Sequence, residues 1–110
     1  MKVKNAELSA RPPKFNRVRQ SFDTTCISGV AMATRRELER LNIPIPKGGN
    51  IAITGGSRGI DNIAIIIHEV VKWVTDCGGK PFIVPAMGSH GGATASGQAY
   101  ILEKFGITEK

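Results

Sequence analysis

Two short apolar runs, each followed by a glycine-rich loop and a helical pattern, constrain the fold of this chain more than any other feature. The runs cover residues 51–54 (IAIT) and 81–86 (PFIVPA), with glycines close to both ends of each. Apolar runs of this length between glycines favour buried strands over helices. A helical crossover between two strands makes them parallel. The sequence therefore predicts an α/β fold, with a small Rossmann-like parallel sheet and a βαβα core.

The helix between the two runs is predicted over residues 61–76. Asp61 or Asn62 is expected to cap its first N–H groups through a side chain. Gly78 and Gly79 follow its end, as is typical of a left-handed cap. Apolar residues recur at helical spacing along it: Ile63, Ile66, Ile67, Val70, Val71 and Val74.

Two further helices are predicted, one on each side of this core. A last helix follows the second run from about Thr94, as N-cap, to Phe105, and Gly106 ends it. A first helix covers residues 29–41 and stops before Pro44.

The N-terminal region gives weaker patterns. Residues 1–13 are polar and end in two prolines, so we expect an irregular arm, and residues 14–22 are expected to hold a short strand. We assign residues 14–110 to one α/β domain. Two strands cannot cover their helices or bury both sheet faces, so we expect this domain to be incomplete and to need more strands or a partner.

The excess positive charge lies outside the glycine motifs. The net charge is +6; residues 1–47 hold ten Lys or Arg and four Asp or Glu, whereas residues 48–110 hold five of each. This distribution favours a solvated basic surface or a contact with an acidic partner. Nucleic-acid binding is not expected, because no known module and no aromatic stacking platform is present.

Cysteine and hydropathy patterns predict a cytoplasmic protein. Cys26 and Cys77 are far apart and lack a CxxC arrangement, so we expect free thiols in a reducing compartment. The N-terminus does not resemble a signal peptide. The longest wholly apolar run, 63–67, is far shorter than the ~20 residues of a membrane helix, so no membrane association is expected.

The loop after the first strand has the composition of an anion site. Because parallel strands end at the same sheet edge, residues 55–59 (GGSRG) and 87–94 (MGSHGGAT) are expected to emerge there together. Backbone N–H groups at Gly55 and Gly56, with the N-terminus of the next helix, favour an anion. Arg58 adds a guanidinium suited to a carboxylate or a phosphate.

The second loop carries a candidate acid–base group. His90 has no apolar neighbour, and an imidazole exchanges protons near neutral pH. Gly88, Ser89 and Gly91 around it are expected to line the anion or cofactor loop. His68 falls opposite the apolar face of its helix and is expected to be exposed and without a role. No metal site is predicted, and the combination of arginine and histidine points to a small carboxylate substrate.

At these two loops the chain resembles the N-terminal domain of the nickel-pincer-dependent lactate racemase family and its uncharacterised relatives. The resemblance covers residues 51–109, above all ITGGSRGI and VPAMGSHGGATASGQ, whereas residues 1–50 match only loosely. This family interconverts the two hands of 2-hydroxy acids with a nickel pincer nucleotide. The resemblance therefore implies the substrate-side domain of a 2-hydroxy-acid racemase or epimerase, an isomerase.

The resemblance also implies roles for individual residues. Arg58 would clamp the substrate carboxylate, and Ser57, where the family often has threonine, would bind the substrate. His90 would be one of two acid–base histidines that exchange the hydroxyl proton. Gly55 and Gly59 stand where the family commonly has an aspartate and a proline, which leaves the identity of the hydroxy acid open.

The remaining groups of the family's active site belong to regions beyond residue 110. They are the second histidine, the lysine that tethers the cofactor and the nickel-binding histidine. The cofactor is therefore expected only in the full-length enzyme, and this chain alone is not expected to turn over. Its partner would be the remaining C-terminal domain or another chain.

Two other functions remain open. One is a non-catalytic α/β module that binds phosphate or another anion at GGSRG. The other is a basic interaction domain that uses residues 1–47, whose binding to an acidic partner would weaken with salt.

Overall fold

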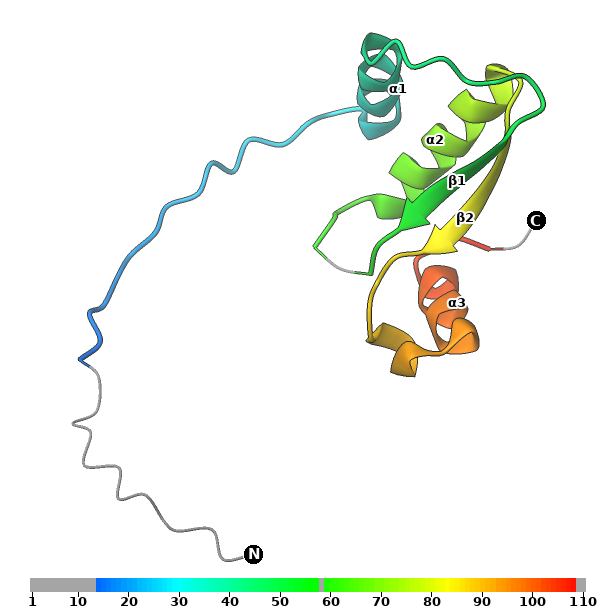
Figure 1. The fold of residues 1–110 in the computed structure, drawn as a ribbon. Helices are drawn as coiled ribbons and strands as arrows, with labels where there is room; N and C mark the ends of the chain where they lie inside the picture. Colours follow the sequence, from blue (N-terminus) through cyan, green and yellow to red (C-terminus); the bar gives the residue numbers. More distant parts are fainter. Residues whose placement is uncertain (1–13, 58, 109–110) are drawn as a thin grey trace, which may run out of the picture.

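The structure, a computed structural model, describes residues 14–57 and 59–108 (Figure 1). This part of the chain is a small α/β protein with three α-helices and a two-stranded parallel sheet. The coarse fold class predicted from the sequence is thereby confirmed. The predictions for residues 1–13 and for Arg58 lie outside the described residues. In chain order the elements are α1 (Val30–Arg40), β1 (Asn50–Gly55), α2 (Ile63–Asp76), β2 (Lys80–Pro85), the 3-10 turn η1 (His90–Ala93) and α3 (Ala95–Lys104).

The two strands run side by side in the same direction. Their register pairs Asn50 with Lys80 at one end and Gly55 with Pro85 at the other. At the carboxyl end, the Ala86 amide donates to the Gly55 carbonyl at 2.8 Å. Both strands therefore finish at the same sheet edge, and the predicted parallel pairing is confirmed.

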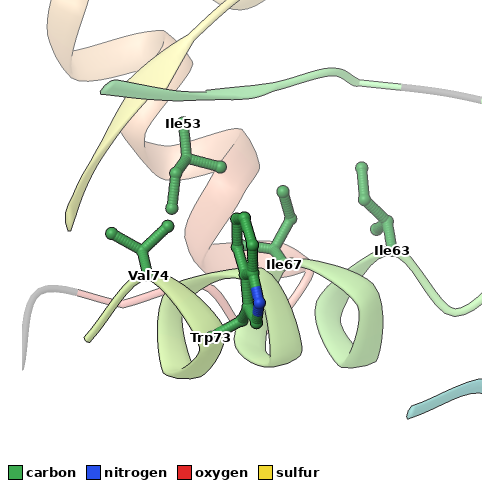
Figure 2. Packing of buried hydrophobic residues seen from close by; sticks show 5 residues of the cluster. All are labelled: Ile53, Ile63, Ile67, Trp73 and Val74. Carbon is green, nitrogen blue, oxygen red and sulfur yellow. The ribbon is translucent and has the colours of Figure 1, made fainter. Parts of the chain in front are cut away.

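Helix α2 covers one face of the sheet and forms the core with it. Figure 2 shows the five buried side chains of this cluster, in which Ile53 of β1 faces the apolar side of α2. Trp73 is part of the cluster although the apolar spacing did not single it out. Burying such side chains contributes roughly 1.5–3 kcal/mol each. The cluster consists of Ile53, Ile63, Ile67, Trp73 and Val74.

The opposite face of the sheet is open. Residues alternate across a strand, and Ala52 and Thr54 of β1 are exposed where Ile53 is buried. On β2, Phe82 is 49% exposed and Val84 is 36% exposed. A two-stranded sheet with one bare apolar face is marginal by itself, as the sequence analysis anticipated.

Helix α1 packs against α2 chiefly through charge. None of its residues is buried. The Arg35 guanidinium contacts Asp76 of α2 at 2.7 Å, Glu69 of α2 at 3.4 Å and Glu39 of its own helix at 3.1 Å. Leu38 adds a half-buried apolar contact with the core. The ion pair with Glu69 is partly buried and those with Asp76 and Glu39 are more exposed, so α1 is joined to α2 without contributing a buried residue to the core.

The segment that precedes α1 makes no regular structure. Residues 14–28 contain neither helix nor strand, and every one of them is exposed. In Figure 1 this segment leads away from α1 and the sheet. The predicted strand at 14–22 is therefore wrong, because a strand needs a neighbour for its backbone hydrogen bonds and no strand of the described residues pairs with this segment. Its exposed apolar residues include Phe15, Val18 and Phe22.

The helix ends follow the predicted glycines, but one predicted cap is absent. Gly78 has a φ of 87° after α2, and Gly106 has a φ of 80° after α3. At the start of α2, Asn62 has a φ of 58° and its side chain caps nothing. The prediction of side-chain capping there is wrong, because the Asp61 carboxylate accepts from the Asn62 amide and side chain instead. No described helix is long and apolar enough to cross a bilayer.

Candidate functional site

The parallel sheet brings one residue of each glycine-rich loop into direct contact. Ser57 follows β1, and His90 follows β2, 33 positions later. The Ser57 Oγ and the His90 Nδ1 share a short hydrogen bond, and both side chains are partly buried. Two of the residues singled out from the sequence therefore meet at the edge where the strands end. Arg58, the third, lies outside the described residues.

The His90 loop begins with a turn that the sequence analysis did not predict. His90 opens η1, and its amide donates to the carbonyl of Met87, whose side chain is buried. Gly91, Gly92 and Ala93 then have φ values of 65°, 68° and 56°. Glycine adopts this left-handed region without strain, which explains the Gly-Gly pair after the histidine.

Helix α3 holds this loop through a close contact between two glycine backbones. A Cβ on Gly97 would overlap the Gly91 carbonyl oxygen, so only glycine fits at this position without a shift of the backbone. Thr94 Oγ1 donates to that same oxygen at 3.1 Å and accepts from the Gly97 amide at 3.1 Å. Gln98 Nε2 donates to the Gly88 carbonyl at 2.7 Å. The first turn of α3 thus fixes the backbone on both sides of His90.

Gly97 and Gln98 are site-building residues that the sequence analysis missed. The available signal was a glycine in the first turn of a predicted helix, where it costs roughly 1 kcal/mol relative to alanine. A glycine at such a cost usually has a packing reason. The predicted N-cap, Thr94, is confirmed, because its hydroxyl accepts from the Gly97 amide.

The glycines assigned to an anion or cofactor loop differ in their surroundings. Gly55 lies against α3, since a Cβ there would be 2.9 Å from Leu102 Cδ2. Gly56 and Gly88 have open space around the Cβ position. Gly91 forms the backbone contact with α3. Ser89 is exposed, and its carbonyl accepts from the Ala93 amide at 3.2 Å.

Metal-ligating side chains do not cluster in the described part of the chain. No group of three or more His, Cys, Asp or Glu side chains gathers in residues 14–57 and 59–108. His68 is exposed on α2, as predicted. The described residues therefore do not supply a set of ligands for a nickel cofactor.

The perturbed charges lie on the N-terminal side, away from the two loops. Hydrogen bonds to Asp76 and Glu39 raise the pKa of Arg35. Hydrogen bonds from the Thr25 hydroxyl and amide lower the pKa of Asp23. Two surface depressions, of about 380 and 520 Å³, also flank α1, and neither is lined by Ser57 or His90. The shifted pKa values and the depressions therefore concern α1 and the segment before it. The loop site is defined by the positions of its residues.

The predicted site residues of the described region therefore gather at one sheet edge, around a cross-loop hydrogen bond between a hydroxyl and an imidazole. Such a pair can hold a proton and pass it to a bound group. Comparisons with protein-family models, with curated proteins and with solved structures found no match to this chain.

Proposed function

We propose that this chain is the substrate-side domain of a 2-hydroxy-acid racemase or epimerase of the lactate racemase type. The observation that carries the proposal is the contact between Ser57 and His90 at the carboxyl edge of the sheet. In open α/β sheets, ligands bind at that edge. Arg58 is the residue after Ser57 in the sequence, so a carboxylate clamp and an acid–base group would come from the same pair of loops.

The two side chains would divide the work on a small 2-hydroxy acid. The Arg58 guanidinium would hold the carboxylate through two parallel hydrogen bonds, which fixes the position of the neighbouring carbon. His90 would accept or return the proton of the 2-hydroxyl group on one face of the substrate, and the second histidine would do so on the other face. Backbone N–H groups of Gly55 and Gly56 would add to the field that favours an anion.

Hydride transfer needs a partner that the described residues do not supply. The resemblance assigns it to a nickel pincer nucleotide, which would be held by the remaining C-terminal domain or by another chain. The open sheet face with Phe82 and Val84 supports a larger assembly, because exposed apolar patches on a sheet mark sites of association. The whole would be a Rossmann-like cytoplasmic enzyme, and the free thiols of Cys26 and Cys77 are compatible with a reducing compartment.

The proposal is tested in the full-length enzyme loaded with its cofactor, with a panel of 2-hydroxy acids and separation of the two enantiomers. His90→Ala should reduce racemisation by about 10²–10⁴-fold, as expected for the loss of a general base. His68→Ala is the matched control, because His68 is exposed on α2 and should leave the rate unchanged. Near-normal turnover of the His90 variant would reject the acid–base role.

Arg58→Lys in the same enzyme tests the clamp. A lysine keeps the charge but cannot make two parallel hydrogen bonds, so KM should rise about tenfold or more. An unchanged KM would remove Arg58 from the substrate site.

Titration of the 110-residue chain with inorganic phosphate and with lactate, followed by NMR, separates the alternative of a non-catalytic anion module. Tight phosphate binding without a second domain would favour that module.

A further inference from the structure

We propose that Ser57 is a positioning residue for His90: its hydroxyl accepts a hydrogen bond from His90 Nδ1–H and so fixes the tautomer of the imidazole. The sequence assigned Ser57 to substrate binding. The structure instead puts its Oγ on the ring nitrogen of the other loop. The bond joins loops that follow different strands, so it exists only because β1 and β2 are parallel and in register.

The direction of this hydrogen bond follows from what an acid–base histidine must do. A hydroxyl can either donate or accept, and a neutral imidazole carries its proton on one nitrogen. The imidazolium form carries a proton on both, so Nδ1 is then necessarily a donor. If Ser57 accepts from Nδ1–H in both forms, its hydroxyl need not reorient when the ring gains or loses a proton at Nε2. The partner of one ring nitrogen decides the state of the other.

The rest of the loop makes this arrangement stable. The His90 backbone is held by a hydrogen bond from its amide to the Met87 carbonyl and by the close contact of Gly91 with Gly97. With its backbone held, the ring keeps one orientation only if a side chain fixes its torsion. Ser57 is a described side chain that contacts the ring, and it comes from the loop that carries Arg58. The bond therefore also sets the spacing of the two loops around a substrate.

The tautomer is measured directly by ¹⁵N–¹H NMR of the histidine rings in the 110-residue chain, at a pH where the imidazoles are neutral. His90 should carry its proton on Nδ1, whereas free imidazole side chains favour Nε2–H. Ser57→Ala should move His90 towards Nε2–H, and Ser57→Thr, which keeps the hydroxyl, should retain Nδ1–H. His68 is exposed and serves as the internal reference, with no change in any variant.

Two results would overturn the inference. One is an Nε2–H form of His90 in the unmodified chain. The other is an unchanged tautomer in Ser57→Ala while the indole signal of Trp73 reports an intact core. The unmodified chain and Ser57→Thr keep the test decisive even if the alanine variant does not fold.

The catalytic purpose of the bond rests on the proposed function and is tested separately. In the full-length enzyme, Ser57→Ala should lower kcat by about 10–100-fold, the scale seen when the orienting partner of a histidine is removed. KM should stay nearly constant, and Ser57→Thr should restore most of the rate. If Ser57→Ala raises KM and leaves kcat unchanged, Ser57 binds the substrate and does not position His90. If His90 carries its proton on Nδ1 but the full-length enzyme has no racemase activity, the proposed function is wrong and the positioning role of Ser57 is retained.

Discussion

The two glycine-rich loops at the sheet edge are built alike in sequence but are held differently. The second loop is tied to the first turn of α3 by the Gly91–Gly97 contact and by hydrogen bonds from Thr94 and Gln98. In the described part of the first loop, Gly56 and Gly59 have open space around them. The hydrogen bond between Ser57 and His90 joins this part of the first loop to the second.

Glycine therefore serves two separate purposes at the carboxyl edge of the sheet. In the second loop, glycine lets backbone meet backbone, so the position of His90 is set before any ligand binds. In the first loop, open glycines leave N–H groups near the place where an anion would lie. Preorganised acid–base groups reduce the cost of reaching the transition state, and under the proposed function the first loop would complete the site by binding the carboxylate.

The largest effect on the difference between the two loops is expected from truncating Leu102, the buried residue of α3. Leu102 is 6% exposed and packs beside Gly55. Leu102→Ala should cost about 2–4 kcal/mol of unfolding free energy, because it leaves a cavity under the helix that holds the second loop. Denaturant unfolding of the 110-residue chain measures this cost. Tyr100→Ala, on the exposed side of the same helix, should cost less than about 1 kcal/mol, and equal costs would contradict this packing.

The next test places a methyl group in the backbone contact itself. Gly97→Ala should destabilise the chain by about 1–3 kcal/mol, because the new Cβ meets the Gly91 carbonyl. Helix propensity alone predicts the opposite sign, a gain of about 1 kcal/mol. Ser96→Ala, at an exposed position in the same turn, is the control. Stabilisation by Gly97→Ala would mean that the second loop is not held by this contact.

A smaller effect is expected at Gly55. A Cβ there meets the end of the Leu102 side chain, which can move, so Gly55→Ala should cost about 1 kcal/mol. In the Leu102→Ala background this cost should largely disappear, because the opposing methyl groups are gone. A double-mutant cycle measures the coupling. Additive costs would show that Gly55 does not touch α3.

The smallest effect is expected at Gly56. Its Cβ position is open and its φ is not in the left-handed region, so Gly56→Ala should change stability by less than about 0.5 kcal/mol. The same variant should weaken anion binding at the first loop if its backbone approaches the ligand. Phosphate and lactate titrations followed by NMR test this. A large loss of stability in Gly56→Ala would show that the first loop is packed as closely as the second, which would contradict the difference described above.

Local patterns account for what could be predicted of this molecule. The two strands, α2 and the left-handed glycine at position 78 follow from periodicity and turn chemistry within a few residues. Trp73 was missed because its burial depends on which face of α2 the sheet covers. The strand at 14–22 was wrongly predicted because a strand depends on a neighbour that a local pattern does not reveal.

The sequence by itself determined the order of the two strands and three α-helices and the parallel direction of the strands, and therefore the sheet edge at which Ser57 and His90 emerge. Periodicity and turn residues are local properties, and one helical crossover suffices to make two strands parallel. Only the tertiary structure decided that the Ser57 hydroxyl meets the His90 ring, and that Gly97 must lack a side chain. Those contacts join residues far apart in the chain, so they depend on strand register and on how α3 packs beside Gly55.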